Sequence, residues 1–363
     1  MTGEELGNGR RPGLDRRVVI TGATGFIGAN LCRHFASAGY KVLAVKGSST
    51  PPWRLPADTR LELTEVDLCS QRAVSQLVRQ SQPCAFIHCA AYGAYDSQND
   101  VQRIYEVNLQ ALRYILESLR AARQLRCFIQ AGTSSEYGFN SAGPSEDAIT
   151  IPDSHYAVSK VAATALVRFY AAKYQLPAWC LRLYSVYGPL EDGSRLIPRL
   201  LIEAKQGRFP PLVQPNISRD FVFMDDVSQA FEQVVLKAND LKPGEIYNIG
   251  TGTGTTLRSL VALTKRLFRL TTKPRWGSMP GRHWDHRTWY SDPRKAREEL
   301  GWRAETALDA GLRTTLHWMG KNPELLKLMR ENTVIASQGP ASGNPPVRLS
   351  SARPALLRRR LYR

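Results

Sequence analysis

Long apolar runs, paired cysteines and acidic residues are all scarce in this sequence. No stretch of about 18 uncharged apolar residues occurs, so we expect no membrane span. Residues 1–17 are polar and lack the apolar core of a secretory signal, so we expect a cytoplasmic protein. The six cysteines form no C-x-x-C pair and no histidine cluster has metal-ligand spacing. The cysteines are therefore expected to be small core residues, and no metal site is expected.

Basic residues exceed acidic ones, with 49 Lys and Arg against 32 Asp and Glu and a formal net charge of +17. Such a balance is typical of some nucleic-acid-binding proteins, but no nucleic-acid-binding motif is present, and this function is not favoured. A basic surface also suits a small anionic substrate such as a nucleoside diphosphate. Part of the excess falls near the C-terminus, at Arg348, Arg353, Arg358, Arg359, Arg360 and Arg363.

Strand and helix patterns alternate along the first half of the chain. Short apolar runs typical of buried strands lie at 18–20, 41–45, 61–66, 85–89, 126–130 and 179–183. Helical patterns lie between them, at 27–37, 71–79, 101–123 and 155–174. This alternation predicts an α/β protein with a Rossmann-type, doubly wound parallel sheet.

The pattern changes after this region, which predicts a smaller C-terminal α/β domain for the substrate. The dinucleotide-binding domain is expected over residues 16–184, and residues 225–249 are expected to return to it. Residues 185–224 and 250–330 are expected to form the substrate domain. Residues 1–15 are predicted to be a flexible N-terminus, and residues 331–363 a basic, disordered tail rich in Gly, Pro, Ser and Arg.

A glycine-rich segment follows the first predicted strand and opens the first predicted helix. Residues 21–28 read T-G-A-T-G-F-I-G, which is the pattern T-G-x-x-G-x-x-G. Glycines at these positions let the backbone approach a pyrophosphate, which a helix N-terminus also attracts. The segment therefore predicts a dinucleotide site. Its candidate binding residues are Gly22, Thr24, Gly25, Phe26, Ile27 and Gly28.

The end of the second predicted strand bears on the choice of dinucleotide. Lys46 stands where NAD-binding proteins carry an acid for the adenosine ribose. A lysine there suits the additional 2′-phosphate of NADP, so NADP(H) is favoured and NAD(H) stays possible; a solvated loop lysine is the alternative. Asn108 lies in an apolar helical pattern and either contacts the cofactor or ties down neighbouring backbone. The other cofactor candidates are Asp67, Leu68, Ala90, Ala91 and Tyr184.

A Y-x-x-x-K pair, Tyr156 and Lys160, lies on a predicted helix, where residues four apart share a face. The lysine ammonium and an oxidised nicotinamide are expected to favour the tyrosine phenolate. The tyrosine can then exchange a proton with a substrate oxygen while hydride moves at the adjacent carbon. Both residues are also candidates for cofactor binding. Thr133, Ser134 and Ser135 complete the catalytic candidates, with a hydroxyl-rich capping turn as the alternative.

Taken together, these residues resemble the extended short-chain dehydrogenase/reductase family, in its NAD-dependent epimerase/dehydratase group. The resemblance covers about residues 17–320 and includes L-R-L-Y-S-V-Y-G-P at 181–189, R-D-F-V-F-M-D-D-V at 219–227 and Y-N-I-G at 247–250. It implies a nucleotide-diphosphate sugar as substrate and a homodimer. It also implies a set of substrate-binding residues, namely Gly93, Ser185, Arg195, Leu196, Arg219, Phe221, Arg282 and Asp285.

The sequence departs from the family pattern at three places. Ser134 and Ser135 stand where dehydratases carry an Asp-Glu pair, and Glu136, one step further on, would point to the other face of an extended segment. Ser185 replaces the usual Asn, which weakens one expected phosphate contact, and Lys46 replaces the usual acid. We therefore expect an NADPH-dependent reductase of a nucleotide-activated 4-keto-6-deoxy sugar. The main alternative is a 4-epimerase with retained NAD; a 4,6-dehydratase and a catalytically silent redox sensor are less favoured.

Overall fold

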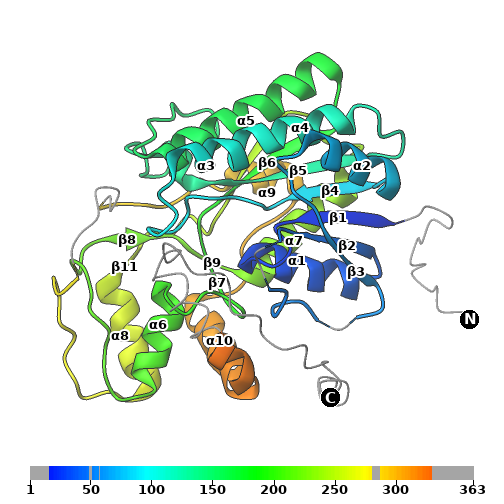
Figure 1. Cartoon of the computed structure of the whole chain (residues 1–363). Helices are drawn as coiled ribbons and strands as arrows, with labels where there is room; N and C mark the ends of the chain where they lie inside the picture. The colour runs from blue at the N-terminus through cyan, green and yellow to red at the C-terminus, as the bar shows by residue number, and fades with distance from the viewer. Residues whose placement is uncertain (1–15, 49–50, 57, 280–286, 329–363) are drawn as a thin grey trace, which may run out of the picture.

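The fold is taken from a computed structural model, which describes residues 16–48, 51–56, 58–279 and 287–328. A parallel sheet of seven strands forms its centre, in the order β10-β6-β5-β4-β1-β2-β3 (Figure 1). The strands are β1 (Arg17–Thr21), β2 (Lys41–Lys46), β3 (Leu61–Glu65), β4 (Ala85–His88), β5 (Cys127–Thr133), β6 (Ala178–Leu183) and β10 (Ile246–Ile249). From β1 the sheet extends through β2 and β3 on one side, and through β4, β5, β6 and β10 on the other. Such a reversal opens a crevice at the carboxyl ends of β1 and β4, where doubly wound folds bind ligands.

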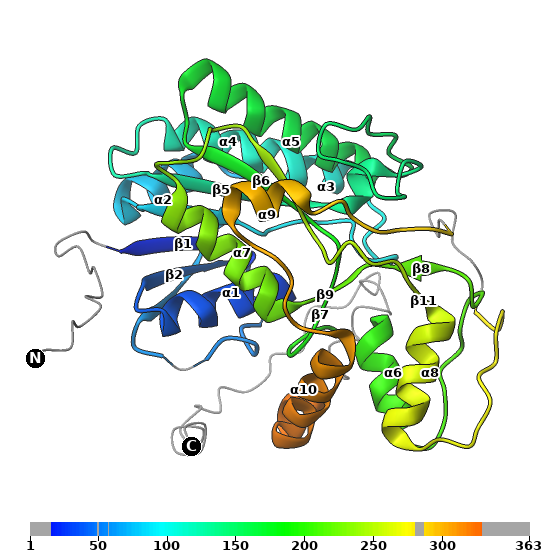
Figure 2. The same cartoon turned by 180° about the vertical axis from the view of Figure 1, so that it is seen from behind.

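Helices cover both faces of the sheet, because the buried strands are apolar on both sides. Val18 and Ile20 of β1 face one core with α1, α7 and α9, whereas Val19 faces the other core with α2, α4 and α5. Figures 1 and 2 show these two helical layers. The predicted doubly wound sheet is therefore confirmed. The helices are α1 (Phe26–Ser37), α2 (Gln71–Ser81), α4 (Ala111–Leu119), α5 (His155–Tyr174), α7 (Met224–Lys237) and α9 (Arg294–Leu300).

The predicted helix over 101–123 is divided into three pieces. It begins as α3 (Val101–Tyr105), passes through a π-helix at Glu106–Gln110 and continues as α4 (Ala111–Leu119). A π-turn inserts one residue and turns the side chains that follow it, and such turns often occur at functional sites. Here the π-helix holds the buried Asn108.

A third hydrophobic core lies beyond the carboxyl edge of the sheet, among α6, α8 and α10 (Figure 1). Leu200, Leu260 and Leu312, one from each of these helices, are fully buried in it. Short strand pairs, β7 with β9 and β8 with β11, connect this core to the sheet. The elements are β7 (Ser185–Tyr187), α6 (Leu196–Ala204), β8 (Ser218–Arg219), β9 (Phe221–Phe223), β11 (Thr255–Thr256), α8 (Leu257–Phe268) and α10 (Leu308–Lys321).

Several sequence predictions fall outside the described residues. These are the flexible N-terminus over 1–15 and the basic tail over 331–363, together with the substrate candidates Arg282 and Asp285.

No helix in the described part of the chain is both long enough and apolar enough to cross a membrane.

Candidate active site

The glycine segment after β1 packs against the backbone that follows β4. Gly22 has a φ of +65°, and a Cβ added there would lie 2.6 Å from the amide nitrogen of Ala90. A Cβ at Gly28 would lie 2.2 Å from the carbonyl oxygen of Gly22. Helix α1 begins directly after Gly25, which caps it without a side-chain acceptor. The segment thus brings a helix N-terminus to the crevice, an arrangement suited to a pyrophosphate.

Lys46 ends β2 beside Glu65, the last residue of β3. Its ammonium donates a hydrogen bond of 2.6 Å to the Glu65 carboxylate. The side chain of Lys46 is 16% exposed and that of Glu65 is 53% exposed. Lys46 is therefore neither a freely solvated lysine nor an uncompensated cation, because a carboxylate offsets its charge.

Asn108 ties the segment after β4 to the helix that carries the candidate catalytic pair. Its amide accepts from the backbone N–H of Tyr92 at 2.8 Å and donates to the backbone carbonyl of the same residue at 2.8 Å. It also donates to the Ser159 hydroxyl on α5 at 2.9 Å. Of the two roles considered for Asn108, the structure displays the tying of neighbouring backbone.

The other cofactor candidates follow the carboxyl ends of β3, β4 and β6. Ala90 and Ala91 follow β4 directly, and Ala90 touches the glycine segment. Asp67, with Leu68 after it, follows β3 and accepts the backbone N–H of Cys69 at 3.0 Å. Tyr184 is 6% exposed and packs in a small aromatic cluster.

Tyr156 lies in the first turn of α5, and Thr133 hydrogen-bonds its phenol. Burial raises the pKa of Tyr156 to about 12, against the lowering effects of the Arg195 charge and the Thr133 hydrogen bond. Without a cofactor charge, burial of the ring thus outweighs the nearby positive charge of Arg195. The expected phenolate depends on an oxidised nicotinamide and stays a prediction.

Lys160 is 2% exposed and donates a hydrogen bond of 2.6 Å to the backbone carbonyl of Ala131 in β5. Burial lowers the pKa of this lysine, while the Glu136 carboxylate raises it. The structure thus brings together Tyr156, Lys160 and Thr133, as the sequence predicted for the catalytic group.

The two serines of the candidate catalytic set lie in a short 3₁₀ helix, Ser134–Tyr137, that Thr133 caps. The Ser134 hydroxyl accepts from the indole N–H of Trp289 at 3.0 Å, and Ser134 is buried. The Thr133 hydroxyl donates to the Ser135 hydroxyl at 3.2 Å and accepts from the Ser135 backbone N–H at 3.2 Å. The Thr133 and Ser135 hydroxyls thus bond to each other, and the Ser134 hydroxyl bonds to Trp289 in the segment that precedes α9.

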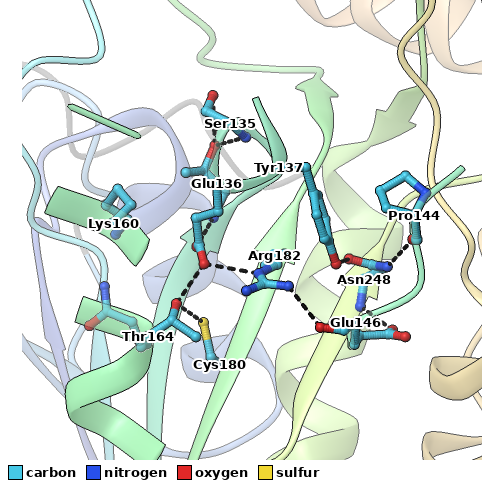
Figure 3. Close-up of polar contacts among 12 residues, drawn as sticks. Ser135, Glu136, Tyr137, Pro144, Glu146, Lys160, Thr164, Cys180, Arg182 and Asn248 are labelled. Carbon is cyan, nitrogen blue, oxygen red and sulfur yellow. Dashed lines mark hydrogen bonds and ion pairs between the residues drawn. The ribbon is translucent and has the colours of Figure 1, made fainter. Parts of the chain in front are cut away.

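Glu136 does not lie in an extended segment, so that part of the sequence analysis is wrong. The 3₁₀ turn directs its carboxylate inward, where it is fully buried and accepts from the Thr133 backbone N–H at 3.0 Å (Figure 3). A capping box between Thr133 and Glu136 is the physical reason for the turn. Glu136 still does not replace the missing dehydratase acid, because its carboxylate points into the protein.

Gly93 and Arg195 lie next to Tyr156. Gly93 has a φ of +98°, and a Cβ there would come within 3.4 Å of Tyr156 Cβ. The Arg195 guanidinium donates to the Ala94 carbonyl at 2.8 Å and lies 4.2 Å from the ring centre of Tyr95. It therefore brings positive charge close to the candidate proton donor, and Leu196, the next residue, begins α6.

The remaining substrate candidates, Ser185, Arg219 and Phe221, lie on the short strands β7, β8 and β9. The guanidinium carbon of Arg219 lies 5.4 Å from the ring centre of Trp289, and Phe221 pairs with Ser185 between β9 and β7. Between these residues Asp220 is fully buried and accepts from the Thr251 hydroxyl at 2.5 Å, from the Gly252 N–H at 3.0 Å and from the Ser291 hydroxyl at 2.6 Å. Asp220 thus fixes the loop after β10 behind Arg219.

Sequence reasoning did not find Trp289 or Tyr95. Trp289 is separated from Ser134 by 155 positions, and Tyr95 lies 100 positions from Arg195 in the numbering. No local pattern joins residues so far apart. The motif R-D-F at 219–221 was the available signal for Asp220, since it places an acid directly beside Arg219, a predicted substrate-binding residue.

The model of the NAD-dependent epimerase/dehydratase family matches residues 18–250. The chain belongs to this family. It is an enzyme family of the extended short-chain dehydrogenase/reductase type that modifies nucleotide sugars and has NAD-bound members.

Relatives within the family differ in their named activities. The trifunctional UDP-glucose 4,6-dehydratase/UDP-4-keto-6-deoxy-D-glucose 3,5-epimerase/UDP-4-keto-L-rhamnose-reductase RHM1 of Arabidopsis thaliana is 26% identical over 85% of this chain. The match covers 48% of RHM1, so the chain spans about half the length of this relative.

Two solved structures of family members show the same fold with ligands. The UDP-glucose 4-epimerase of Thermotoga maritima with UDP-glucose is 27% identical, with a TM-score of 0.76, and covers 85% of this chain and 99% of its own. MoeE5 in complex with UDP-glucuronic acid and NAD is 29% identical, with a TM-score of 0.73, and covers 84% and 99%.

Proposed function

We propose that this family member reduces a nucleotide-activated 4-keto-6-deoxy sugar with NADPH. The observation that carries the proposal is the turn beside Tyr156, in which the dehydratase acid positions hold Ser134 and Ser135 and the one carboxylate, that of Glu136, is buried. Dehydration of a sugar needs an acid and a base to remove water, whereas reduction of a carbonyl needs only a hydride and one proton donor. Ser134 and Ser135 thus support a reductase over a dehydratase.

The glycine segment and the N-terminus of α1 would hold the dinucleotide, whose nicotinamide would supply the hydride for the new C–H bond. Tyr156 donates its phenolic proton to the oxygen that becomes a hydroxyl, and Thr133 hydrogen-bonds the same oxygen. Since burial holds the pKa of Tyr156 at about 12, the phenol keeps its proton across the neutral range, which is the form that reduction consumes. Lys160, anchored on Ala131, places an ammonium on the same face of α5.

Two arginines supply the charge that a diphosphate needs. Arg195 lies near Tyr156, and Arg219 lies against the ring of Trp289, whose indole N–H donates to Ser134 in the catalytic turn. Guanidinium groups bind phosphate oxygens by paired hydrogen bonds, so both are suited to the nucleotide part of the substrate. The UDP-sugars named in the two solved relatives are compatible with this assignment.

A 4-epimerase with retained NAD is the second candidate, and the pair between Lys46 and Glu65 favours it. The Glu65 carboxylate both offsets the charge offered to a 2′-phosphate and supplies an acceptor for ribose hydroxyls at the same edge of the sheet. The reductase proposal requires that a bound 2′-phosphate compete with Glu65 for Lys46.

A coupled assay separates the two activities. Purified protein is given NADPH and a nucleotide-linked 4-keto-6-deoxy hexose, and nicotinamide absorbance is followed with product formation. We expect one NADPH oxidised per product, and a loss of turnover of about 10²- to 10⁴-fold in Tyr156→Phe. Conversion of one C4 epimer into the other, with bound NAD and no net absorbance change, would establish the epimerase instead.

The same assay tests the cofactor preference. Loss of a charge-assisted hydrogen bond of about 1–3 kcal/mol lowers NADPH affinity by roughly 5- to 150-fold. Lys46→Asp is therefore expected to weaken NADPH by this factor and NADH little. An unchanged preference would remove Lys46 from the argument.

A further inference from the structure

A fully buried carboxylate lies behind the catalytic turn and is bound from three sides. Oε1 of Glu136 accepts the backbone N–H of Thr133 at 3.0 Å. Its Oε2 accepts the Thr164 hydroxyl at 2.7 Å and Nε of Arg182 at 2.9 Å (Figure 3). The three partners come from β5, α5 and β6, so this single carboxylate joins the elements that carry the active site.

The contact with Thr164 falls on the face of α5 that carries the catalytic pair. Tyr156, Lys160 and Thr164 are spaced by four residues, and such positions lie in one stripe along a helix. Lys160 in turn donates to Ala131, two residues before Thr133 on β5. The carboxylate and the ammonium therefore connect the same helix face to the same strand end.

The neighbouring backbone leaves room for the carboxylate. Gly132 lies between Ala131 and Thr133, and a Cβ added there would lie 2.9 Å from Oε1 of Glu136 and 2.7 Å from Sγ of Cys180. A side chain at this position would displace the carboxylate.

Arg182 compensates the charge of Glu136 and is itself held in place. It is 4% exposed, donates to the Glu146 carbonyl at 3.1 Å and lies 4.5 Å from the ring centre of Tyr137 (Figure 3). The Tyr137 hydroxyl donates to Asn248 at 2.7 Å. A buried charge persists only when it is paired and hydrogen-bonded, and Glu136 meets both conditions.

We propose that Glu136 is a positioning residue for the proposed reduction: it holds the strand end that carries Thr133 against the face of α5 that carries Tyr156 and Lys160. The inference rests on the proposed function. It explains why a carboxylate stands one residue beyond the place where a dehydratase would carry its acid. At that neighbouring position the group points inward and acts on the catalytic residues, not on the sugar.

The groups around Lys160 and Tyr156 determine in which direction Glu136 shifts the pKa values of these two residues. Burial lowers the pKa of Lys160, whereas Glu136, Cys180 and Cys89 raise it. The neutral, buried His88 is also close enough to be affected by the lysine charge.

Around the tyrosine, Arg195 and Thr133 lower the pKa of Tyr156, whereas burial, Glu136 and Tyr95 raise it. Removing the Glu136 charge therefore lowers the pKa of both members of the pair. Reduction consumes the protonated tyrosine, so kcat falls at alkaline pH where Tyr156 loses its proton. In a variant without the Glu136 charge, this alkaline limb of the pH profile should move to lower pH.

The test compares Glu136→Gln with Glu146→Gln in the full chain. Glu146 is also a buried carboxylate that accepts a backbone N–H, that of Asn248 at 2.7 Å, but it is absent from the groups that face Lys160 and Tyr156. We expect Glu136→Gln to move the alkaline limb down by about one pH unit and to lower kcat at least about tenfold, with the KM for the nucleotide sugar within about twofold. Glu146→Gln should leave the limb in place.

A double variant keeps the test decisive if Arg182, left unpaired, prevents Glu136→Gln from folding. Glu136→Gln with Arg182→Met removes both charges of the pair, and the limb should still move down. An unmoved limb in the folded variant overturns the role of Glu136. Failure of the wild type to oxidise NADPH instead overturns the reductase proposal, and the same pH profiles are then measured on C4 epimerisation, which uses the same pair.

Discussion

His88 should make the stability of this enzyme depend strongly on pH between 7 and 5. The residue ends β4, is fully buried and shares a hydrogen bond of 2.6 Å between Nδ1 and the Thr21 hydroxyl. Its Nε2 has no partner among the described residues. Burial, reinforced by the positive charge of Lys160, lowers the pKa of His88 from 6.5 to about 3. A proton on this ring would be both uncompensated and poorly solvated.

The magnitude follows from proton linkage. Below pH 6.5 the unfolded chain binds a proton at this position, while the folded chain stays neutral until about pH 3. The stabilising contribution is therefore complete above pH 6.5 and is lost as the pH falls. Between pH 7 and pH 5 the loss amounts to about 2 kcal/mol, since each further unit below the unfolded pKa costs about 1.4 kcal/mol.

Urea unfolding at pH 7 and pH 5 measures this loss. The wild type and His88→Gln, which keeps a polar side chain beside Thr21 but does not titrate, are compared at both values. Carboxyl groups titrate alike in the two proteins, so their contribution cancels when the losses of unfolding free energy are compared. We expect the wild type to lose about 2 kcal/mol more than the variant. Equal losses would show that His88 is protonated in the folded state and would refute the reasoning.

Two further predictions concern cofactor binding and assembly. Gly28→Ala places a Cβ 2.2 Å from the Gly22 carbonyl oxygen, so it should weaken binding of the nicotinamide cofactor by roughly 5- to 150-fold in a fluorescence titration. Gly320→Ala is the control and should leave binding unchanged, because its added Cβ would have no atom within 4 Å. On α5, Val158 is 40% exposed and Phe169 is 50% exposed, which suits close helix packing in a homodimer. Light scattering should report a dimer at micromolar concentration and a monomer for Phe169→Glu; a monomeric wild type would refute this.

Local sequence patterns were sufficient to predict the framework of the site. The helix expected over 155–174 is α5 to the residue, and the strand expected over 85–89 is β4 with one residue fewer. Apolar periodicity and glycine spacing are properties of neighbouring residues, so they can be recognised without knowledge of the fold. The same holds for Tyr156 and Lys160, which one helical turn brings together.

Contacts between distant segments were decided only by the tertiary structure. The partner of Lys46 comes from the next strand, and the partner of Ser134 is Trp289. The π-helix around Asn108 likewise depends on bonds to Tyr92 and to α5, whereas local helix propensity predicts an unbroken helix.

Glu136 shows the physical reason most clearly. In the sequence, Glu136 simply follows three hydroxyl residues, 133–135. If this segment were extended, the Glu136 side chain would lie on the face opposite to that of Ser135. Burial next to Arg182 makes a charged pair whose energy depends on the removal of water from both groups, and no sequence pattern contains that information. The residues able to do the chemistry can be identified from the sequence, but packing and desolvation determine which of them are charged, which are held in place and which face the substrate.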